Sequence, residues 1–172
     1  LTLADADAGQ LIRDREPCDL RVIVEKTIAM LAPLAKVRLV DVRPSVGPAM
    51  VDGDPLRLAQ LVENLPSNAI RYNRKGGSVE VSVCADQDVV KLTISDTGLG
   101  IPRECLPHVF QRFYRADQGR ARSDGGAGLG LAICEEIVRA HDGTVRIDSE
   151  PGLGTVVQVE LPGSERRPHG TN

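Results

Sequence analysis

The sequence is poor in aromatic residues: it has no tryptophan, and two tyrosines with two phenylalanines make up only 2% of its 172 residues. Single-stranded nucleic acid is bound largely by stacking on such rings, so this function is disfavoured. An excess of positive charge is also missing, because the formal net charge is -3. Nucleic acid and anionic lipid are therefore not expected as the main partners.

Long apolar runs and paired cysteines are missing as well. No run approaches the roughly 20 residues that a membrane span needs, and no charged-then-apolar leader opens the sequence. Cys18, Cys84, Cys105 and Cys134 form no CxxC pair and no metal-like spacing, so we expect buried free thiols in a reducing compartment. With 41% hydrophobic and 26% charged residues, the composition is that of one soluble globular domain.

Hydrophobic periodicity predicts an α+β fold. Apolar residues at helical spacing predict helices over 20–31, 55–73 and 129–142, with Asp19 and Asp54 as caps. Alternating or apolar runs predict strands over 37–42, 78–85, 89–96, 144–149 and 154–161, with a turn-rich connection over 43–48. We therefore expect a two-layer α/β sandwich, with about three helices on one face of a mixed five-stranded sheet. Residues 96–127, hereafter the lid, form a long glycine-rich and polar segment.

The segment NLPSNAIRYN places Asn64 and Asn68 one helical turn apart, on one face of the predicted helix. Amide oxygens are suitable ligands for Mg²⁺ beside phosphates, although such a pair is usually only a solvated face. Pro66 lies between them and would cost roughly 3 kcal/mol in a regular helix interior. A kink there would alter the relative geometry of the two amides.

Two glycine-rich segments follow. Asp96, Gly98 and Gly100 come directly after a predicted strand, which can present one carboxylate to a ligand that the backbone approaches closely, or can form a capped tight turn. The segment GGAGLGLAI leads into a predicted helix, whose unpaired N–H groups and dipole would favour an anion such as phosphate. A flexible linker has a similar composition.

These motifs occur in one order, with the aromatic and basic stretch HVFQRFYRA before the glycine loop and Gly154-Thr155 after it. In this order they resemble the catalytic, ATP-binding domain of bacterial sensor histidine kinases, over about residues 19–161. That family shares its fold with gyrase, heat-shock chaperone and mismatch-repair ATPases. The resemblance implies binding of ATP and Mg²⁺, and transfer of the γ-phosphoryl group to a histidine in two-component signal transduction.

The resemblance also implies roles for individual residues. Asn68 corresponds to the Mg²⁺ ligand, Asp96 to the acceptor for the adenine amino group, and Thr155 to a support for the adenine edge. Phe110 and Phe113 correspond to the lid anchors. The positions implied for catalysis are Asn64, Arg112 and Arg115. The positions implied for ATP binding are Asn68, Arg71, Tyr72, Asp96, Gly98, Gly100, Ile101, Phe113, Gly126, Gly128, Leu129, Gly130 and Thr155.

The sequence lacks the general base of the hydrolysing relatives. A glutamate in those relatives occupies the position of Asn64, and an amide cannot take a proton. The neighbouring Glu63 would project about 100° away around the helix. Phosphoryl transfer to a neutral imidazole needs less from a base, so a kinase is favoured. A degenerate nucleotide-sensing module and a slow ATPase that uses Glu63 remain alternatives.

The histidine acceptor is not expected within this sequence. His108, His141 and His169 all lack the His-Glu/Asp-x-x-x-Pro setting of an acceptor helix. We expect residues 1–15 to be a remnant of a dimerisation-domain helix and linker, 16–162 the ATP-binding domain and 163–172 a disordered tail. The fragment is expected to be monomeric and cytoplasmic. Its parent would be a homodimeric membrane sensor kinase that signals to a response regulator, with no nucleic acid partner.

Overall fold

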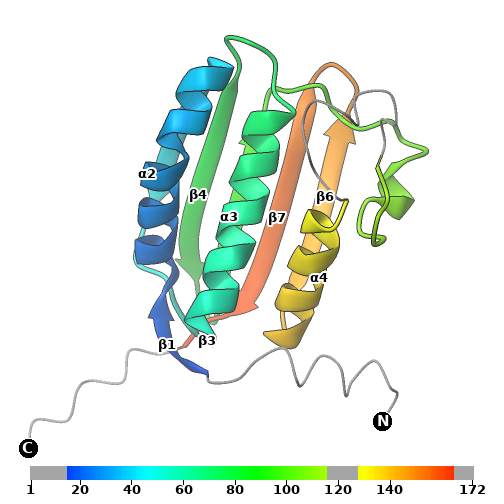
Figure 1. The fold of residues 1–172 in the computed structure, drawn as a ribbon. Helices are drawn as coiled ribbons and strands as arrows, with labels where there is room; N and C mark the ends of the chain where they lie inside the picture. Colours follow the sequence, from blue (N-terminus) through cyan, green and yellow to red (C-terminus); the bar gives the residue numbers. More distant parts are fainter. Residues whose placement is uncertain (1–14, 116–127, 165–172) are drawn as a thin grey trace, which may run out of the picture.

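The computed structural model describes residues 15–115 and 128–164, and it has two layers. Helices lie side by side over one face of a mixed sheet (Figure 1). The helices are α2 (Leu20–Arg38), α3 (Pro55–Arg71), α4 (Gly130–Ala140) and the short 3-10 helix η1 (Leu106–His108). The strands are β1 (Glu16–Asp19), β2 (Asp41–Val46), β3 (Met50–Gly53), β4 (Ser78–Asp86), β5 (Val89–Asp96), β6 (Thr144–Glu150) and β7 (Gly154–Pro162). The predicted α+β sandwich is confirmed.

The main sheet has five strands in the order β2-β4-β5-β7-β6. β2 runs parallel to β4, and the other neighbouring strands are antiparallel. The hairpins β4–β5 and β6–β7 alternate buried and more exposed residues, as expected for a sheet with one covered face. β1 and β3 form a separate two-stranded sheet.

Both predicted helix caps are present. The Asp19 carboxylate accepts the Arg21 N–H, and the Asp54 carboxylate accepts the Leu56 and Arg57 N–H groups, as N-cap side chains do. The predicted end of α2 near residue 31 is wrong, because the helix continues past Pro33 to Arg38. It stops where Leu39 adopts a left-handed conformation with φ 56° and ψ 46°, a typical C-terminal signal.

The predicted strand over 37–42 and turn over 43–48 are also wrong in their boundaries. Strand β2 covers Asp41–Val46 and includes Pro44. A proline removes one ladder donor, and it is tolerated here because β2 is an edge strand with β4 as its neighbour.

The core lies between the helical layer and the covered face of the sheet. Its largest fully buried side chains include Leu20, Leu58, Leu61, Ile70 and Leu92. Of the four cysteines, Cys18 and Cys134 are buried as predicted, whereas Cys84 is exposed on β4. No helix in residues 15–115 or 128–164 is long and apolar enough to span a bilayer.

Candidate functional site

The side of α3 that meets α4 carries both asparagines of the predicted metal and phosphate site. A methyl group placed on Gly130 would lie 3.6 Å from Asn68 Nδ2 and 3.9 Å from Asn64 Oδ1. Both amide side chains are half-buried. The fold therefore brings Asn64 and Asn68 together with the first residue of α4, as the resemblance implied.

The groups at this junction fit a magnesium ion that is held mainly by a nucleotide. Within residues 15–115 and 128–164, no three His, Cys, Asp or Glu side chains gather in a way that could hold a metal. Mg²⁺ usually takes one or two protein oxygens and fills the remaining positions with phosphate oxygens and water. The amide oxygen of Asn68 could supply one such ligand.

The start of α4 is suited to an anion. Leu129 is the N-cap residue and makes no side-chain cap hydrogen bond to the first turn. The N–H groups of a first helical turn have no partner inside the helix, so a phosphate can accept hydrogen bonds from them. Since Gly130 lies beside Asn64 and Asn68, this anion site and the amides face the same region.

Asp96 lies at the end of β5, opposite Thr155 of β7. Its Oδ1 accepts a hydrogen bond of 2.7 Å from the Gly98 N–H. Burial raises the pKa of the Asp96 carboxyl, and backbone hydrogen bonds from Gly98 and Thr155 partly oppose this rise. Asp96 is thus a shielded carboxylate with spare acceptor capacity, as a purine amino group requires.

The backbone after Asp96 is packed too closely for a larger residue than glycine. A Cβ at Gly98 would lie 2.6 Å from the Tyr72 carbonyl oxygen, and the Leu99 N–H donates to that same oxygen at 3.1 Å. A Cβ at Gly154 would collide with the Asp96 carbonyl. The end of α3, the end of β5 and the start of β7 therefore converge on Asp96.

Ser149 of β6 is a site residue that the sequence did not indicate. Its Oγ accepts the Ile101 N–H at 2.8 Å, lies 2.8 Å from Thr155 Oγ1, and donates to the Gly154 carbonyl at 2.9 Å. Gly100, at φ +69°, allows the chain to pass against the Glu150 carbonyl. The predicted residues Ile101 and Thr155 are thereby joined through one hydroxyl, and Gly100 directly precedes Ile101.

The two described ends that flank residues 116–127 are hydrogen-bonded to each other. The Phe113 N–H donates to the Gly128 carbonyl at 2.9 Å. Both residues have positive φ, 66° for Phe113 and 71° for Gly128, and a Cβ at Gly128 would lie 2.9 Å from the Tyr114 carbonyl oxygen. Phe113 is 72% exposed, so it is not a core residue, whereas Phe110 is half-buried.

The predicted basic residues lie around this region. Arg112 forms an ion pair with Glu136 of α4, through Nε at 3.0 Å and through a guanidinium NH₂ at 2.5 Å. Arg115 is half-buried, and Arg71 is exposed at the end of α3. Tyr72, the next residue, is 48% exposed. The polar, glycine-rich composition of residues 117–128 predicts disorder without nucleotide. This stretch, which contains Gly126, lies outside the described residues except for Gly128.

Two further features of α3 bear on the chemistry. Glu63 is exposed on the helix surface, whereas Asn64 and Asn68 are half-buried. Asn64 makes a side-chain hydrogen bond to the thiol of Cys134. Burial raises the pKa of this thiol to about 12. The thiol is therefore protonated and neutral at pH 7.

Comparison with known proteins supports the same assignment. The family described as "Histidine kinase-, DNA gyrase B-, and HSP90-like ATPase" matches residues 53–165. The chain belongs to this family. Among solved structures, the mycobacterial sensor histidine kinase MprB is 31% identical with a TM-score of 0.75, covering 87% of this chain and 97% of that chain. The protein is therefore a catalytic ATP-binding domain of the sensor histidine kinase type.

Other relatives are much longer than this domain. Sensor histidine kinase CusS from Escherichia coli O6:H1 is 40% identical over 162 residues, which cover 94% of this chain and 34% of CusS. A structure of full-length ShkA in complex with AMPPNP is 25% identical with a TM-score of 0.76, covering 87% of this chain and 31% of that chain. The kinase-type domain spans 18% to 34% of the first curated relatives that it matches.

Proposed function

We propose that this domain binds Mg·ATP and donates its γ-phosphoryl group to a histidine on a separate dimerisation domain. The observation that carries the proposal is the contact of Gly130 with Asn64 and Asn68. This contact joins an uncapped helix start to two neutral amides, a combination suited to a metal-bound polyphosphate. The similarity to ShkA, whose structure contains AMPPNP, agrees with it.

The adenine would be bound at the Asp96 end of the site. Its amino group would donate to the Asp96 carboxylate, which Gly98 already holds through one oxygen. Thr155 pairs with Ser149 through its hydroxyl, and it retains a lone pair toward the purine edge. Gly98 and Gly100 would let the backbone approach the base, and Ile101 and Tyr72 would contact it.

The phosphates would be bound at the start of α4. The N–H groups around Gly128, Leu129 and Gly130 would hold them, and Arg71 and Arg115 would offset their charge. Arg112 would contribute only after it leaves Glu136. Asn68 would hold Mg²⁺, which neutralises phosphate charge when bound.

Transfer to histidine agrees with the lack of a base. The lone pair of a neutral imidazole nitrogen would attack the γ-phosphorus, forming the P–N bond while the bond to the ADP oxygen breaks. Little proton transfer is needed for the attack itself. Because Glu63 is exposed and Asn64 is an amide, water would not be activated efficiently.

Calorimetric binding of AMPPNP tests the nucleotide site. We expect Mg²⁺-dependent binding by the wild type and a loss of about tenfold or more in Asn68→Ala, a change of about 1.4 kcal/mol. The exposed neighbour Glu63→Gln is the matched control and should bind like the wild type. Binding by Asn68→Ala that is as tight as that of the wild type and keeps the same Mg²⁺ dependence would refute the metal assignment.

A transfer assay with γ-labelled ATP and a separate histidine-bearing domain tests the enzyme. Label on the histidine supports the kinase. Nucleotide binding without transfer would instead support the binding-module alternative. Phosphate release that falls in Glu63→Gln would support a slow ATPase.

The remaining assignments also stay proposals. We infer that residues 16–162 form the functional domain, although hydrogen bonds continue through Gly163 and Ser164. The resemblance is the basis for a dimeric parent, a response regulator downstream, a monomeric fragment and the cytoplasmic side of a membrane sensor. The net charge and the scarcity of aromatic residues are the basis for expecting no nucleic acid partner. Residues 1–14 and 165–172 lie outside the described residues.

A further inference from the structure

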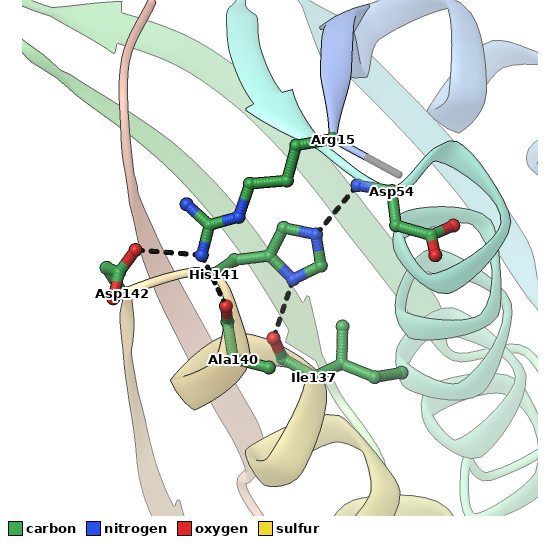
Figure 2. A network of polar contacts seen from close by, with 6 residues as sticks. All are labelled: Arg15, Asp54, Ile137, Ala140, His141 and Asp142. Carbon is green, nitrogen blue, oxygen red and sulfur yellow. Dashed lines mark hydrogen bonds and ion pairs between the residues drawn. The ribbon is translucent and has the colours of Figure 1, made fainter. Parts of the chain in front are cut away.

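His141 joins the far ends of the two helices that build the proposed site (Figure 2). It is the C-cap residue of α4 and is only 3% exposed. Its Nε2 accepts the backbone N–H of Asp54, the N-cap of α3, at 3.0 Å, and its Nδ1 lies 2.7 Å from the Ile137 carbonyl oxygen. One nitrogen must accept and the other must donate, so this geometry requires a neutral imidazole with its proton on Nδ1.

The imidazole has no space in which to move. A Cβ at Gly53 would lie 2.6 Å from His141 Cδ2 and 2.9 Å from Leu58 Cδ1, and Leu58 is fully buried in α3. The ring is therefore packed between the last residue of β3 and the first turn of α3. A shift of the ring would require a shift of one of these elements.

Charged groups surround this contact. Arg15 donates to the Ala140 carbonyl at 2.6 Å and pairs with Asp142 at 2.9 Å. Burial is the main cause that lowers the pKa of His141, and Arg15 adds to it. The hydrogen bond to the Ile137 carbonyl and the charges of Asp54 and Asp142 act in the opposite direction. Arg15, which directly precedes β1, thus favours the neutral ring and also binds the end of α4.

Helices α3 and α4 approach each other at two points, and the stretches of the two helices between these points are almost equally long. On α4, the eleven residue steps from Gly130 to His141 cover about 16 Å, and on α3, the ten residue steps from Asp54 to Asn64 cover about 15 Å. The His141–Asp54 hydrogen bond defines one end, and the approach of Gly130 to Asn64 defines the other. A displacement at the His141 end would be carried along the helix to Gly130.

We propose that His141 is a positioning residue for the nucleotide site: its hydrogen bond to Asp54 sets the register of α4 along α3, and thereby the place of Gly130 beside Asn64 and Asn68. The inference rests on the proposed function. It assigns a role in nucleotide binding to a residue that lies about 16 Å along α4 from the proposed phosphate site. It also gives Arg15 a role in holding the contact between His141 and Asp54.

The test compares His141→Leu with His141→Gln. Leucine roughly fills the space but leaves the Asp54 N–H without an acceptor, whereas glutamine can accept through its side-chain oxygen. Calorimetry with AMPPNP and Mg²⁺ is run at pH 7.5, well below the melting temperature of each variant, so that every molecule is folded. We expect His141→Leu to lose about fivefold or more in affinity, and His141→Gln to stay within about twofold of the wild type.

Val81→Ala is the matched control, because Val81 is fully buried in β4, away from α4. It should lower the melting temperature and leave the affinity unchanged. If His141→Leu behaves in the same way, the residue is merely structural and the inference is overturned. If the wild type itself binds no AMPPNP, the proposed function fails first, and the two failures are distinguishable.

A pH series gives a second test that does not depend on the leucine variant. The ratio of wild-type to His141→Gln affinity is followed from pH 8 to pH 5.5, so that the titration of the nucleotide cancels. Protonation of His141 would abolish its acceptor, so we expect the wild type to lose affinity relative to His141→Gln on acidification. Protonation of the ring is followed in the same samples by the NMR signals of its carbon-bound protons, and the series is extended downward in pH until His141 is protonated. A flat ratio across that protonation in folded protein overturns the inference.

Discussion

Removal of the Ser149 hydroxyl tests whether one side chain holds the adenine end of the site together. This Oγ has one hydrogen and two lone pairs. When it donates to the Gly154 carbonyl at 2.9 Å, its lone pairs accept from the Ile101 N–H at 2.8 Å and from the Thr155 hydroxyl at 2.8 Å. Ser149→Ala therefore removes one contact to the distant Ile101 and two contacts across the β6–β7 hairpin.

The expected loss follows from the value of each contact. A hydrogen bond contributes about 0.5–1.5 kcal/mol net, and half-buried partners can regain water, so three contacts amount to about 1–2 kcal/mol of unfolding free energy. For the nucleotide, Thr155 would lose its fixed hydroxyl orientation, and the Gly100–Ile101 turn would loosen. We expect AMPPNP affinity to fall about three- to tenfold, which is about 0.7–1.4 kcal/mol.

Urea unfolding and calorimetry on the same preparations measure both effects. Ser82→Ala is the control, because Ser82 is a half-buried serine in β4 that lies outside the site. It should change neither quantity appreciably. If Ser149→Ala loses no more stability or affinity than Ser82→Ala, the reasoning about this hydroxyl is refuted.

Three further predictions follow from single features. Burial raises the pKa of Asp96 in the folded state. Protonated Asp96 therefore adds stability below pH about 4, and this contribution is lost as pH rises through the folded pKa. In thermal melts from pH 3 to 7, the melting temperature of Asp96→Asn should rise relative to that of the wild type, while calorimetry should show weaker AMPPNP binding by the variant. Leu39 is 60% exposed and has φ 56°. The substitution Leu39→Gly should raise the free energy of unfolding by about 0.5–1 kcal/mol in urea, because glycine adopts the left-handed conformation more easily. Arg112→Ala should change stability by less than about 1 kcal/mol, because its pair with Glu136 is exposed on the arginine side; a larger loss in the same assay would contradict this.

Features encoded by neighbouring residues were predictable from the sequence. Asp19 and Asp54 cap helices as expected, because a cap involves only the next two or three residues. The hairpin strands β4 and β5 follow the alternation of apolar residues to within one residue. The approach of Asn68 to Gly130 was predictable only through the ordered set of motifs, since no local pattern places α4 beside α3.

Features that depend on distant partners were not predictable. β2 contains a proline and polar residues, and it is a strand because β4 offers it a parallel edge. Strands β1 and β3 have four residues each and form a ladder with each other, and four residues are too few for a clear period. Ser149 bonds to Ile101, 48 positions away, and His141 to Asp54, 87 positions away, so their roles have no local signature.

Pro66 is tolerated in α3 because its cost is small beside the burial of the helix. The proline removes one intrahelical donor, at roughly 3 kcal/mol. Leu58, Leu61, Leu65 and Ile70 of the same helix are all at most 2% exposed, and their burial contributes about 1.5–3 kcal/mol each, or about 6–12 kcal/mol together. The helix therefore remains continuous from Pro55 to Arg71. Because the tertiary contacts rather than the local hydrogen bonds hold α3 in place, the turn after Pro66 keeps its i to i+4 bond from the Tyr72 N–H to the Asn68 carbonyl at 2.9 Å, and Asn68 keeps its place beside Gly130.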